Sequence, residues 1–232
     1  MTIVASAEEQ PVELTPAQAA AAAKVAFAVE VPGAVVVLCG PPGVGKTTVL
    51  AHLAAAATAA GRPVRVSSLA ELAGGADGEQ AQCDGRGTRS APTHDILLVD
   101  DAHETDVVGL ADRLGRCRRC RPATAVVLAG EGRLLSLVAG DTRLEQSIRL
   151  RATLPVFSFA DTLRLLAGRR ESVAVVGADE AVLRTIHEIA GGVPTVCLRL
   201  AEVADMLAVA MPRPLTADDI EMIHRRLSLS AA

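Results

Sequence analysis

Residues 40–48 read Gly40-Pro41-Pro42-Gly43-Val44-Gly45-Lys46-Thr47-Thr48, which fits every fixed position of the phosphate-binding pattern G-x-x-x-x-G-K-[ST]. The glycines let the backbone curl so that successive N–H groups face a phosphate, and the following helix adds the positive end of its dipole. An apolar run at 34–39 precedes the stretch and a helix is predicted at 48–60, so strand, loop and helix occur in the required order. We therefore predict that the whole stretch binds the phosphates of a nucleoside triphosphate.

Two side chains of this loop have defined roles in the pattern. Lys46 reaches the β- and γ-phosphates, and Thr47 places its hydroxyl on Mg²⁺. The chain contains 21 arginines but only two lysines, Lys24 and Lys46, so the lysine at this position does not follow from composition. The alternative, a glycine-rich turn without a ligand, is disfavoured by the agreement of strand, loop and helix.

A second motif lies about 50 residues further on. The stretch 95–103 reads DILLVDDAH, an apolar strand that ends in Asp100 and Asp101. The carboxyl end of a buried parallel strand opens onto the ligand crevice, so Asp100 is predicted to hold Mg²⁺ through water. Asp101 is positioned to polarise the attacking water, and the alternative is an ordinary acidic strand end. We expect His103 to cap the following helix rather than to line the site.

A third candidate for the nucleotide site is Glu131. The strand predicted at 124–129 ends in Gly130-Glu131-Gly132, where a polar sensor of the γ-phosphate is expected. A carboxylate is an unusual choice at this position, but we include Glu131 among the nucleotide-binding candidates.

The hydrophobic pattern predicts an α/β fold with a five-stranded parallel sheet and a small, helical C-terminal lid. The expected strands cover 34–39, 64–67, 95–101, 124–129 and 148–155. The expected helices cover 15–30, 48–60, 69–72, a segment ending at 114, a segment starting near 133, and then 158–168, 179–190, 194–209 and 216–227. This pattern divides the chain into a mobile tail at 1–14, a core at 15–157 and a lid at 158–232. Residues 73–93 carry five glycines and are predicted to be a flexible insertion, or else a substrate loop with Arg86 and Arg89.

Composition limits the class of protein. The chain has 232 residues, of which 50% are hydrophobic, and a net charge of −4, which argues against a globally basic nucleic-acid binder. No apolar stretch is long enough to span a membrane, and the first residues lack the basic region of a secretory signal, so a cytoplasmic protein is expected.

One local basic cluster stands out on this acidic chain. Its members are Arg113, Arg116, Arg118, Arg119 and Arg121. We interpret the cluster as a solvated helix end, which the helix dipole favours, and keep a contact with nucleic acid or an acidic partner as the alternative.

Five cysteines are too irregular for a disulfide framework. Cys117 and Cys120 form a C-x-x-C pair without a second pair at zinc-ribbon spacing, and Cys83 with His94 would complete an irregular metal site. Inert thiols are the expectation, with a metal site or a redox pair as alternatives.

In sequence order, the phosphate-binding loop, LLVDDAH, VVLAGEGRL, LEQSIRLRATLPVFSFADT and IHEIAGGVPTVCLRLAEVA resemble AAA+ ATPases of the general secretion pathway protein A type, which are similar to transposition helper ATPases. The resemblance covers roughly residues 15–228. It implies ATP and Mg²⁺ as ligands, ATP hydrolysis, and a homo-oligomer in which a neighbouring subunit completes the site. It also suggests a protein partner in a secretion, cell-envelope or DNA-associated assembly.

The chain departs from this family at three positions. Asp101 replaces the usual glutamate and is one methylene shorter, and a displacement of about 1 Å can slow catalysis about 100-fold. Ser147 replaces an arginine expected to act in trans on the neighbouring subunit's nucleotide. Arg149 and Arg151, which face the same side of a strand, are the substitutes, and we name Arg149 as the catalytic candidate. Thr195 replaces the lid arginine that senses the γ-phosphate, with Arg199 as the nearest substitute.

Three functions remain open on these grounds. The first is an ATPase that uses Lys46, Thr47, Asp100 and Asp101 to drive the assembly or remodelling of a partner. The second is a nucleotide-dependent binding module with negligible turnover, which Ser147 and Thr195 favour. A small-molecule kinase fits less well, because the strand end at Asp100 and Asp101 and the helical lid suit an ATPase better, and the sequence contains no recognisable acceptor site.

Overall fold

A computed structural model describes residues 14–68, 95–168, 179–211 and 213–230. The predicted tail at 1–14, the helix at 69–72 and the insertion at 73–93 lie wholly or almost wholly outside the described residues. The chain divides into two compact units. The first comprises Met1–Gly40 and Lys46–Leu154, and the second comprises Pro41–Gly45 and Pro155–Ala232.

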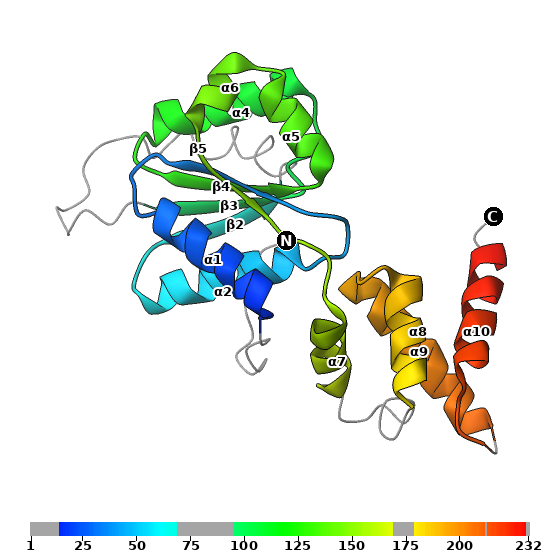
Figure 1. The fold of residues 1–232 in the computed structure, drawn as a ribbon. Helices are drawn as coiled ribbons and strands as arrows, with labels where there is room; N and C mark the ends of the chain where they lie inside the picture. The colour runs from blue at the N-terminus through cyan, green and yellow to red at the C-terminus, as the bar shows by residue number, and fades with distance from the viewer. Residues whose placement is uncertain (1–13, 69–94, 169–178, 212, 231–232) are drawn as a thin grey trace. The chain divides into compact units, whose positions relative to one another are not determined.

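The first unit is built on a five-stranded parallel sheet, as predicted (Figure 1). Its strands are β1 (Val35–Cys39), β2 (Val64–Ser68), β3 (Ile96–Asp100), β4 (Ala125–Gly130) and β5 (Ile148–Thr153), in the order β2-β3-β4-β1-β5. The central strands β1 and β4 are apolar apart from Gly130 and fully buried, because helices cover both faces of the sheet. Strand β5 lies at the edge and alternates, so that Arg149 and Arg151 are exposed on the same side.

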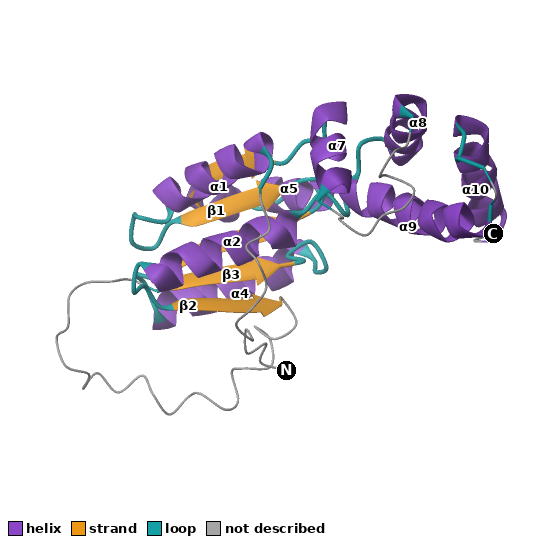
Figure 2. Cartoon of the chain, turned by 90° about the horizontal axis from the view of Figure 1, so that it is seen from below, coloured by secondary structure: helices purple, strands orange, loops and turns teal. Residues whose placement is uncertain are grey.

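Helices cover the two faces of this sheet in separate layers (Figures 1 and 2). Helices α1 (Pro16–Ala28) and α2 (Lys46–Ala59) pack on one face, and α4 (Val107–Cys120), α5 (Gly132–Ala139) and α6 (Thr142–Ser147) pack on the other. Leu110, Leu128 and Leu134 are fully buried in the layer between the sheet and α4 and α5. Burying each of these side chains stabilises the unit by about 1.5–3 kcal/mol relative to leaving it exposed.

A pocket of about 160 Å³ lies between α1, α2 and the sheet. Its lining is mainly apolar and includes Val25, Leu53 and Leu98. Arg62 at its rim forms an ion pair with Glu30 and donates a second bond to the Val29 carbonyl. The pair therefore ties the chain just after α1 to the turn that follows α2.

The second unit contains four helices around their own apolar core. They are α7 (Phe159–Ala167), α8 (Glu180–Ala190), α9 (Pro194–Ala210) and α10 (Ala217–Ser230). The core includes Leu166, Ile186 and Ile220, all fully buried. The chain therefore ends in a helical unit.

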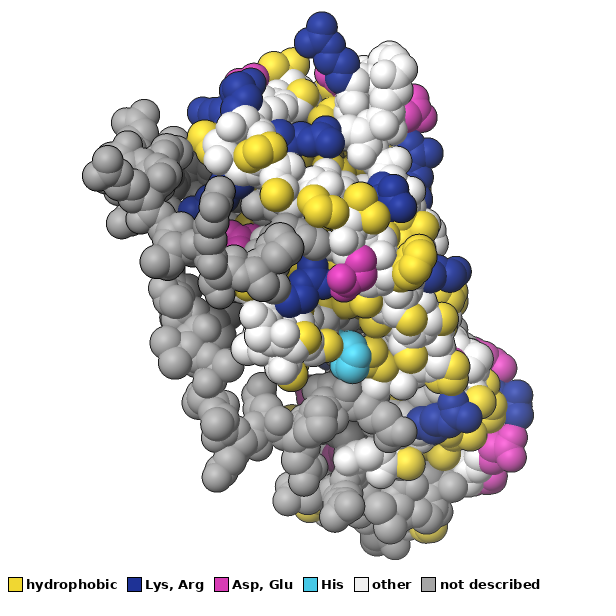
Figure 3. All heavy atoms as spheres, turned by 90° about the vertical axis from the view of Figure 1, so that its left-hand side faces the viewer, with side chains coloured by type: hydrophobic (Ala, Val, Ile, Leu, Met, Phe, Trp, Pro, Cys, Tyr) yellow, Lys and Arg dark blue, Asp and Glu magenta, His cyan; other side chains and the backbone are white. Residues whose placement is uncertain are grey.

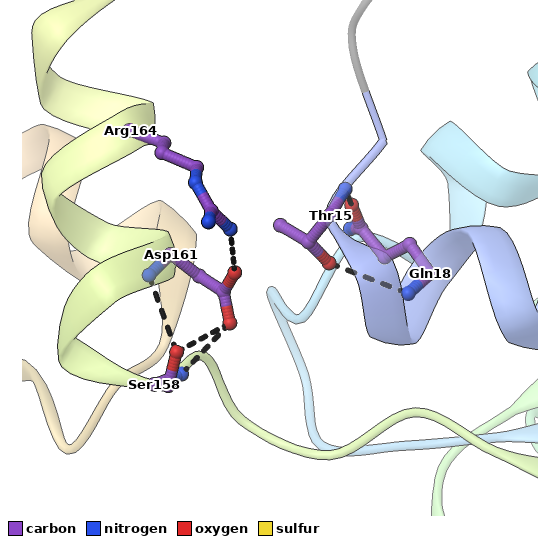
Figure 4. Close-up of polar contacts among 5 residues, drawn as sticks. All are labelled: Thr15, Gln18, Ser158, Asp161 and Arg164. Carbon is purple, nitrogen blue, oxygen red and sulfur yellow. Dashed lines mark hydrogen bonds and ion pairs between the residues drawn. The ribbon is translucent and has the colours of Figure 1, made fainter.

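The sequence signals for helix starts are confirmed at two helices that Figure 4 shows. Thr15 and Gln18 form a reciprocal capping box at α1, with the proline at the first helical position. Ser158 and Asp161 form the second box at α7, where Asp161 also pairs with Arg164. Each box satisfies backbone N–H groups that the helix cannot satisfy itself.

Several predicted boundaries are wrong, and two of these involve candidate residues. Helix α2 begins at Lys46 rather than at 48, so the lysine and Thr47 are helical residues. Helix α4 continues to Cys120 instead of ending at Leu114, because Cys117 still packs against the core and the basic side chains suit a helix C-terminus. Within the described residues, none of the helices is long and apolar enough to cross a membrane.

Candidate functional site

The two sequence motifs meet at the carboxyl edge of the sheet. The hydroxyl of Thr47 donates a hydrogen bond of 2.6 Å to Asp100 Oδ2, although the residues are 53 positions apart. Strands β1 and β3 flank β4, so the loop after β1 and the last residue of β3 arrive at the same edge. A hydroxyl and a carboxylate side by side form the hard oxygen donor set that Mg²⁺ prefers. The residues present therefore fit the predicted metal.

Lys46 lies at the start of α2 and is only 8% exposed. Its Nζ donates to the carbonyl of Gly40 at 3.0 Å, across the base of the loop. The loop thus holds its own lysine in a folded position. A phosphate that enters the loop meets an ammonium group whose long side chain is already ordered.

The loop uses glycine where other residues would be strained. Gly43 and Gly45 have φ values of +73° and +96°. These are conformations that residues with a Cβ rarely adopt. Pro41, Pro42 and Gly43 are exposed, so this part of the loop is accessible to a ligand.

Asp101 leaves the strand in an unusual conformation. Among the described residues it is the only one other than glycine with positive φ, at +50°. Its N–H donates to Asp100 Oδ1 at 3.0 Å, and its carbonyl accepts from Glu104, so the chain turns immediately after β3. The side chain is exposed. Asp101 is therefore near the predicted position, but it lies in a turn rather than in line with the strand.

Glu131 follows β4 and lies between the two motifs. The Gly130 carbonyl accepts from the N–H of Gly40, and the Ala129 carbonyl accepts from the N–H of Ala102. Glu131 is the N-cap residue of α5, but its side chain makes no capping hydrogen bond. Its carboxylate is therefore not committed to the helix that it precedes.

His103 does not cap the following helix, which corrects the expectation from sequence. The N-cap of α4 is Asp106, whose Oδ1 accepts from the N–H of Gly109 at 2.6 Å. His103 instead places Nε2 3.7 Å from Glu131 Oε1. Its Nδ1 is buried and has no hydrogen-bond partner among the described residues. The pairing joins residues 28 positions apart, and no local pattern in the sequence predicts it.

The remaining arginine candidates lie on strand β5 and helix α9. Arg149 is exposed on β5 with no ion pair among the described residues, whereas Arg151 pairs with Glu145 at 3.3 Å. Arg199 is exposed on α9. Ser147, which stands at the expected arginine position, donates its hydroxyl to the Leu144 carbonyl at the end of α6.

Thr195, the replacement for the predicted sensor arginine, contacts the phosphate-binding loop itself. Its hydroxyl and its N–H both donate to the Gly43 carbonyl, at 2.9 and 3.4 Å. A Cβ on Gly43 would lie 3.2 Å from Val193 Cγ1. These contacts place the segment Pro41–Gly45 in the second unit. Sequence reasoning missed the contact because the partners are 152 positions apart.

The basic cluster on α4 is partly used within the chain. Arg118 donates to the Gly33 carbonyl, and Arg121 pairs with Asp95 at 3.6 Å. Figure 3 shows Lys and Arg side chains at several separate places on one face, with hydrophobic side chains between them. Arg118 and Arg121 of the cluster therefore contact other parts of the chain.

The described cysteines are free thiols. Burial raises the pKa of the Cys39, Cys117 and Cys197 thiols, which disfavours the reactive thiolate. The described residues contain no cluster of three or more His, Cys, Asp or Glu side chains that could hold a metal. The suggested ligands Cys83 and His94 lie outside the described residues.

Comparison with known proteins gives a family and a fold. A family model described as an AAA domain matches residues 13–142. No curated protein sequence matches significantly. Among solved structures, the ORC1 protein of Aeropyrum pernix in complex with DNA is similar at a TM-score of 0.66 and 16% identity, over 94% of this chain and 67% of that one. The ORC2 protein of the same organism is similar at a TM-score of 0.61 and 16% identity, over 95% of this chain and 70% of that one. Domain III of the Thermotoga maritima replication initiation protein DnaA is similar at a TM-score of 0.60 and 14% identity, over 91% of this chain and 92% of that one.

Proposed function

Because the chain belongs to the AAA domain family, we propose that it is an AAA+ ATPase that binds ATP with Mg²⁺ and couples hydrolysis to the assembly or remodelling of a macromolecular partner. The observation that carries the proposal is the contact between Thr47 and Asp100. It brings the two nucleotide motifs together at the edge of the sheet where α/β proteins bind ligands.

Each residue of the site has a role in this proposal. The backbone of Gly40–Gly45 and the start of α2 bind the phosphates, and Lys46 neutralises the β- and γ-phosphates. Thr47 and Asp100 hold Mg²⁺, which supplies charge neutralisation on the transferred phosphoryl group when bound. Arg149 is the candidate for contact with the nucleotide of a neighbouring subunit.

The proposal is tested by ATP affinity and steady-state hydrolysis of the full chain beside Lys46→Ala. Lys24→Ala is the matched control, since it removes the only other lysine, which is exposed on α1. We expect Lys46→Ala to lose ATP binding and turnover and Lys24→Ala to keep both. Failure of the unaltered chain to bind ATP would overturn the proposal.

A second candidate function is an ATP-dependent switch with negligible turnover. Thr195 favours it, because this side chain is bonded to the loop carbonyl of Gly43 and is too short to act as the missing sensor arginine. The same assay separates the two functions. ATP binding without turnover at any protein concentration would support the switch and exclude the hydrolysing enzyme.

The identity of the partner belongs to the proposal as well. The general secretion pathway and transposition helper resemblance suggests an envelope, secretion or DNA-associated assembly in the cytoplasm, and the ORC1 structure contains DNA. Nucleic-acid binding through the α4 arginines would weaken steeply with salt and be lost when Arg116 and Arg119 are replaced by alanine. Nucleic-acid binding that persists at high salt and after replacement of both arginines would show that the α4 arginines do not form the binding surface.

A further inference from the structure

We propose that Glu131 is a catalytic residue of the ATPase, the carboxylate that orients and deprotonates the attacking water, and that His103 is the positioning residue that holds it. This inference rests on the proposed function. It reassigns a residue that sequence alone suggests only as a contact for the nucleotide.

The first argument is position. Glu131 directly follows Gly130, whose carbonyl accepts from Gly40, the residue at which the phosphate-binding loop begins. On its other side, β4 is bonded through Ala129 to the turn that follows Asp101. The backbone of Glu131 therefore lies at the same edge of the sheet as the start of the phosphate-binding loop and the turn after Asp100.

The second argument is that the Glu131 carboxylate is available. Glu131 is the N-cap residue of α5, and its side chain accepts no hydrogen bond from the first N–H groups of that helix. Its side chain is 39% exposed, so one carboxylate oxygen can meet water while the other faces His103. A general base must reach the proton that it removes directly or through one water molecule.

The third argument is the orientation of His103. The nitrogen that faces Glu131 Oε1, at 3.7 Å, is Nε2, and an ionised carboxylate can only accept hydrogen bonds. The carboxylate therefore favours the tautomer with the proton on Nε2, and the buried Nδ1, which has no partner among the described residues, then carries no proton. The imidazole can then donate to the carboxylate and fix its direction as the contact shortens.

The fourth argument concerns the competing carboxylate. Asp101 is one methylene shorter than glutamate, and its positive φ turns the chain away from the strand direction. Catalytic groups must be placed to within a fraction of an ångström, so a longer side chain from the adjacent strand end is better suited to reach the water.

In the reaction, the water oxygen forms a bond to the γ-phosphorus while the bond from that phosphorus to the bridging oxygen breaks. The electron pair of the broken bond leaves with ADP. One water proton passes to a Glu131 carboxylate oxygen and from there to solvent, which regenerates the carboxylate.

The test is hydrolysis and ATP affinity of the full chain with Glu131→Gln, His103→Ala and His103→Gln, beside Glu104→Gln. The control removes a neighbouring exposed carboxylate. We expect Glu131→Gln to lower kcat by about 100-fold or more while ATP affinity is kept or increased, since general-base catalysis contributes about 10²–10⁴-fold. His103→Ala should lower kcat without raising KM, and His103→Gln, which restores a donor near Nε2, should recover part of it.

Turnover in Glu131→Gln within about threefold of the unaltered chain would overturn this inference alone and leave the ATPase standing. The inference would also be overturned if Asp101→Asn abolished ATP hydrolysis while Glu131→Gln retained it. If the unaltered chain binds ATP but hydrolyses none, both the ATPase and the role of Glu131 are excluded. Loss of ATP binding in the unaltered chain excludes the nucleotide site as a whole.

Discussion

Asp100 makes two contacts that organise the metal site, one to the hydroxyl of Thr47 and one to the N–H of Asp101. Its carboxylate therefore lies in a fixed direction before a nucleotide arrives. A group that is ordered in advance loses little conformational entropy on binding. The cation should then depend on this one residue more than on any other carboxylate of the described chain.

We predict that Asp100→Asn weakens ATP binding in the presence of Mg²⁺ by about 10–100-fold, the range found for residues that orient a metal's ligands. Affinity measured with the metal chelated should not change. Titration calorimetry in the two conditions checks this, with the exposed Asp112→Asn on α4 as control. Equal losses with and without Mg²⁺ would contradict the metal role.

Gly43 offers a second prediction at the level of one residue. An added Cβ would lie 2.8 Å from Thr195 Oγ1 and 3.0 Å from Thr195 Cβ, at a φ of +73°. Gly43→Ala should therefore lower thermal stability and weaken ATP binding. The backbone conformation alone costs about 1–2 kcal/mol for alanine.

Gly61→Ala is the matched control for this change. Gly61 has a φ of +70°, but an added Cβ there meets nothing within 4 Å. The difference in Tm between the two variants isolates the contact with Thr195. Equal decreases in Tm for the two variants would show that the contact with Thr195 does not contribute to stability.

The turn into α10 shows how one carboxylate fixes an element. Asp219 is 5% exposed and accepts from both guanidinium nitrogens of Arg213 and from the N–H and hydroxyl of Thr216. These hydrogen bonds to the ionised form hold the pKa of Asp219 well below its ordinary value of 3.8. The stabilisation therefore belongs to the charged side chain.

A carboxyl whose pKa is lower in the folded state stabilises the fold above its ordinary pKa and loses that effect as the pH falls toward the lowered value. We predict that Asp219→Asn is less stable than the unaltered chain at pH 7. The gap should narrow progressively as the pH falls below about 4, because the aspartate of the unfolded chain becomes protonated there while that of the folded chain stays ionised. Denaturant unfolding followed by circular dichroism at several pH values measures it, with exposed Asp218→Asn as control. A gap that stays constant with pH would contradict the assignment.

Elements governed by local pattern are the ones that the sequence predicts well. The five strands, the capping boxes at Thr15 and Ser158, and the motif residues Lys46, Thr47 and Asp100 all follow from spacing and residue type. The end of α4 does not, since its last turns pack only through Cys117 and carry solvated arginines. The His103 and Glu131 pair and the Thr195 contact depend on tertiary packing across 28 and 152 positions, which no local pattern encodes.

The expected oligomer makes a prediction for the whole molecule. Arg149 is exposed on the edge strand, with no ion pair among the described residues, so a neighbouring subunit's nucleotide could be its target. Arg149→Ala and Lys46→Ala chains should each be inactive alone. The first lacks the arginine but binds ATP, and the second lacks ATP but supplies the arginine.

Mixing the two inactive chains should restore part of the turnover, because some interfaces then combine an intact ATP site with an intact arginine. A trans-acting arginine contributes about 10³–10⁵-fold in rate, so even partial restoration is measurable. The control is the Lys46→Ala chain alone, assayed at the same total protein concentration as the mixture. Absence of any recovery would remove Arg149 from the site.

The strand order also determines how long β1 remains unpaired while the chain is being synthesised. Strand β1 lies between β4 and β5, so neither of its partners exists until residues 125–153 have emerged. At about 5–20 residues per second, the interval from Cys39 to Gly130 lasts roughly 5–20 s. For that time the run Val35–Cys39, which is wholly apolar, has two open edges. We expect the nascent chain to need a chaperone or a protective contact during this interval, and a ribosome-bound chain stopped before residue 124 to aggregate on release.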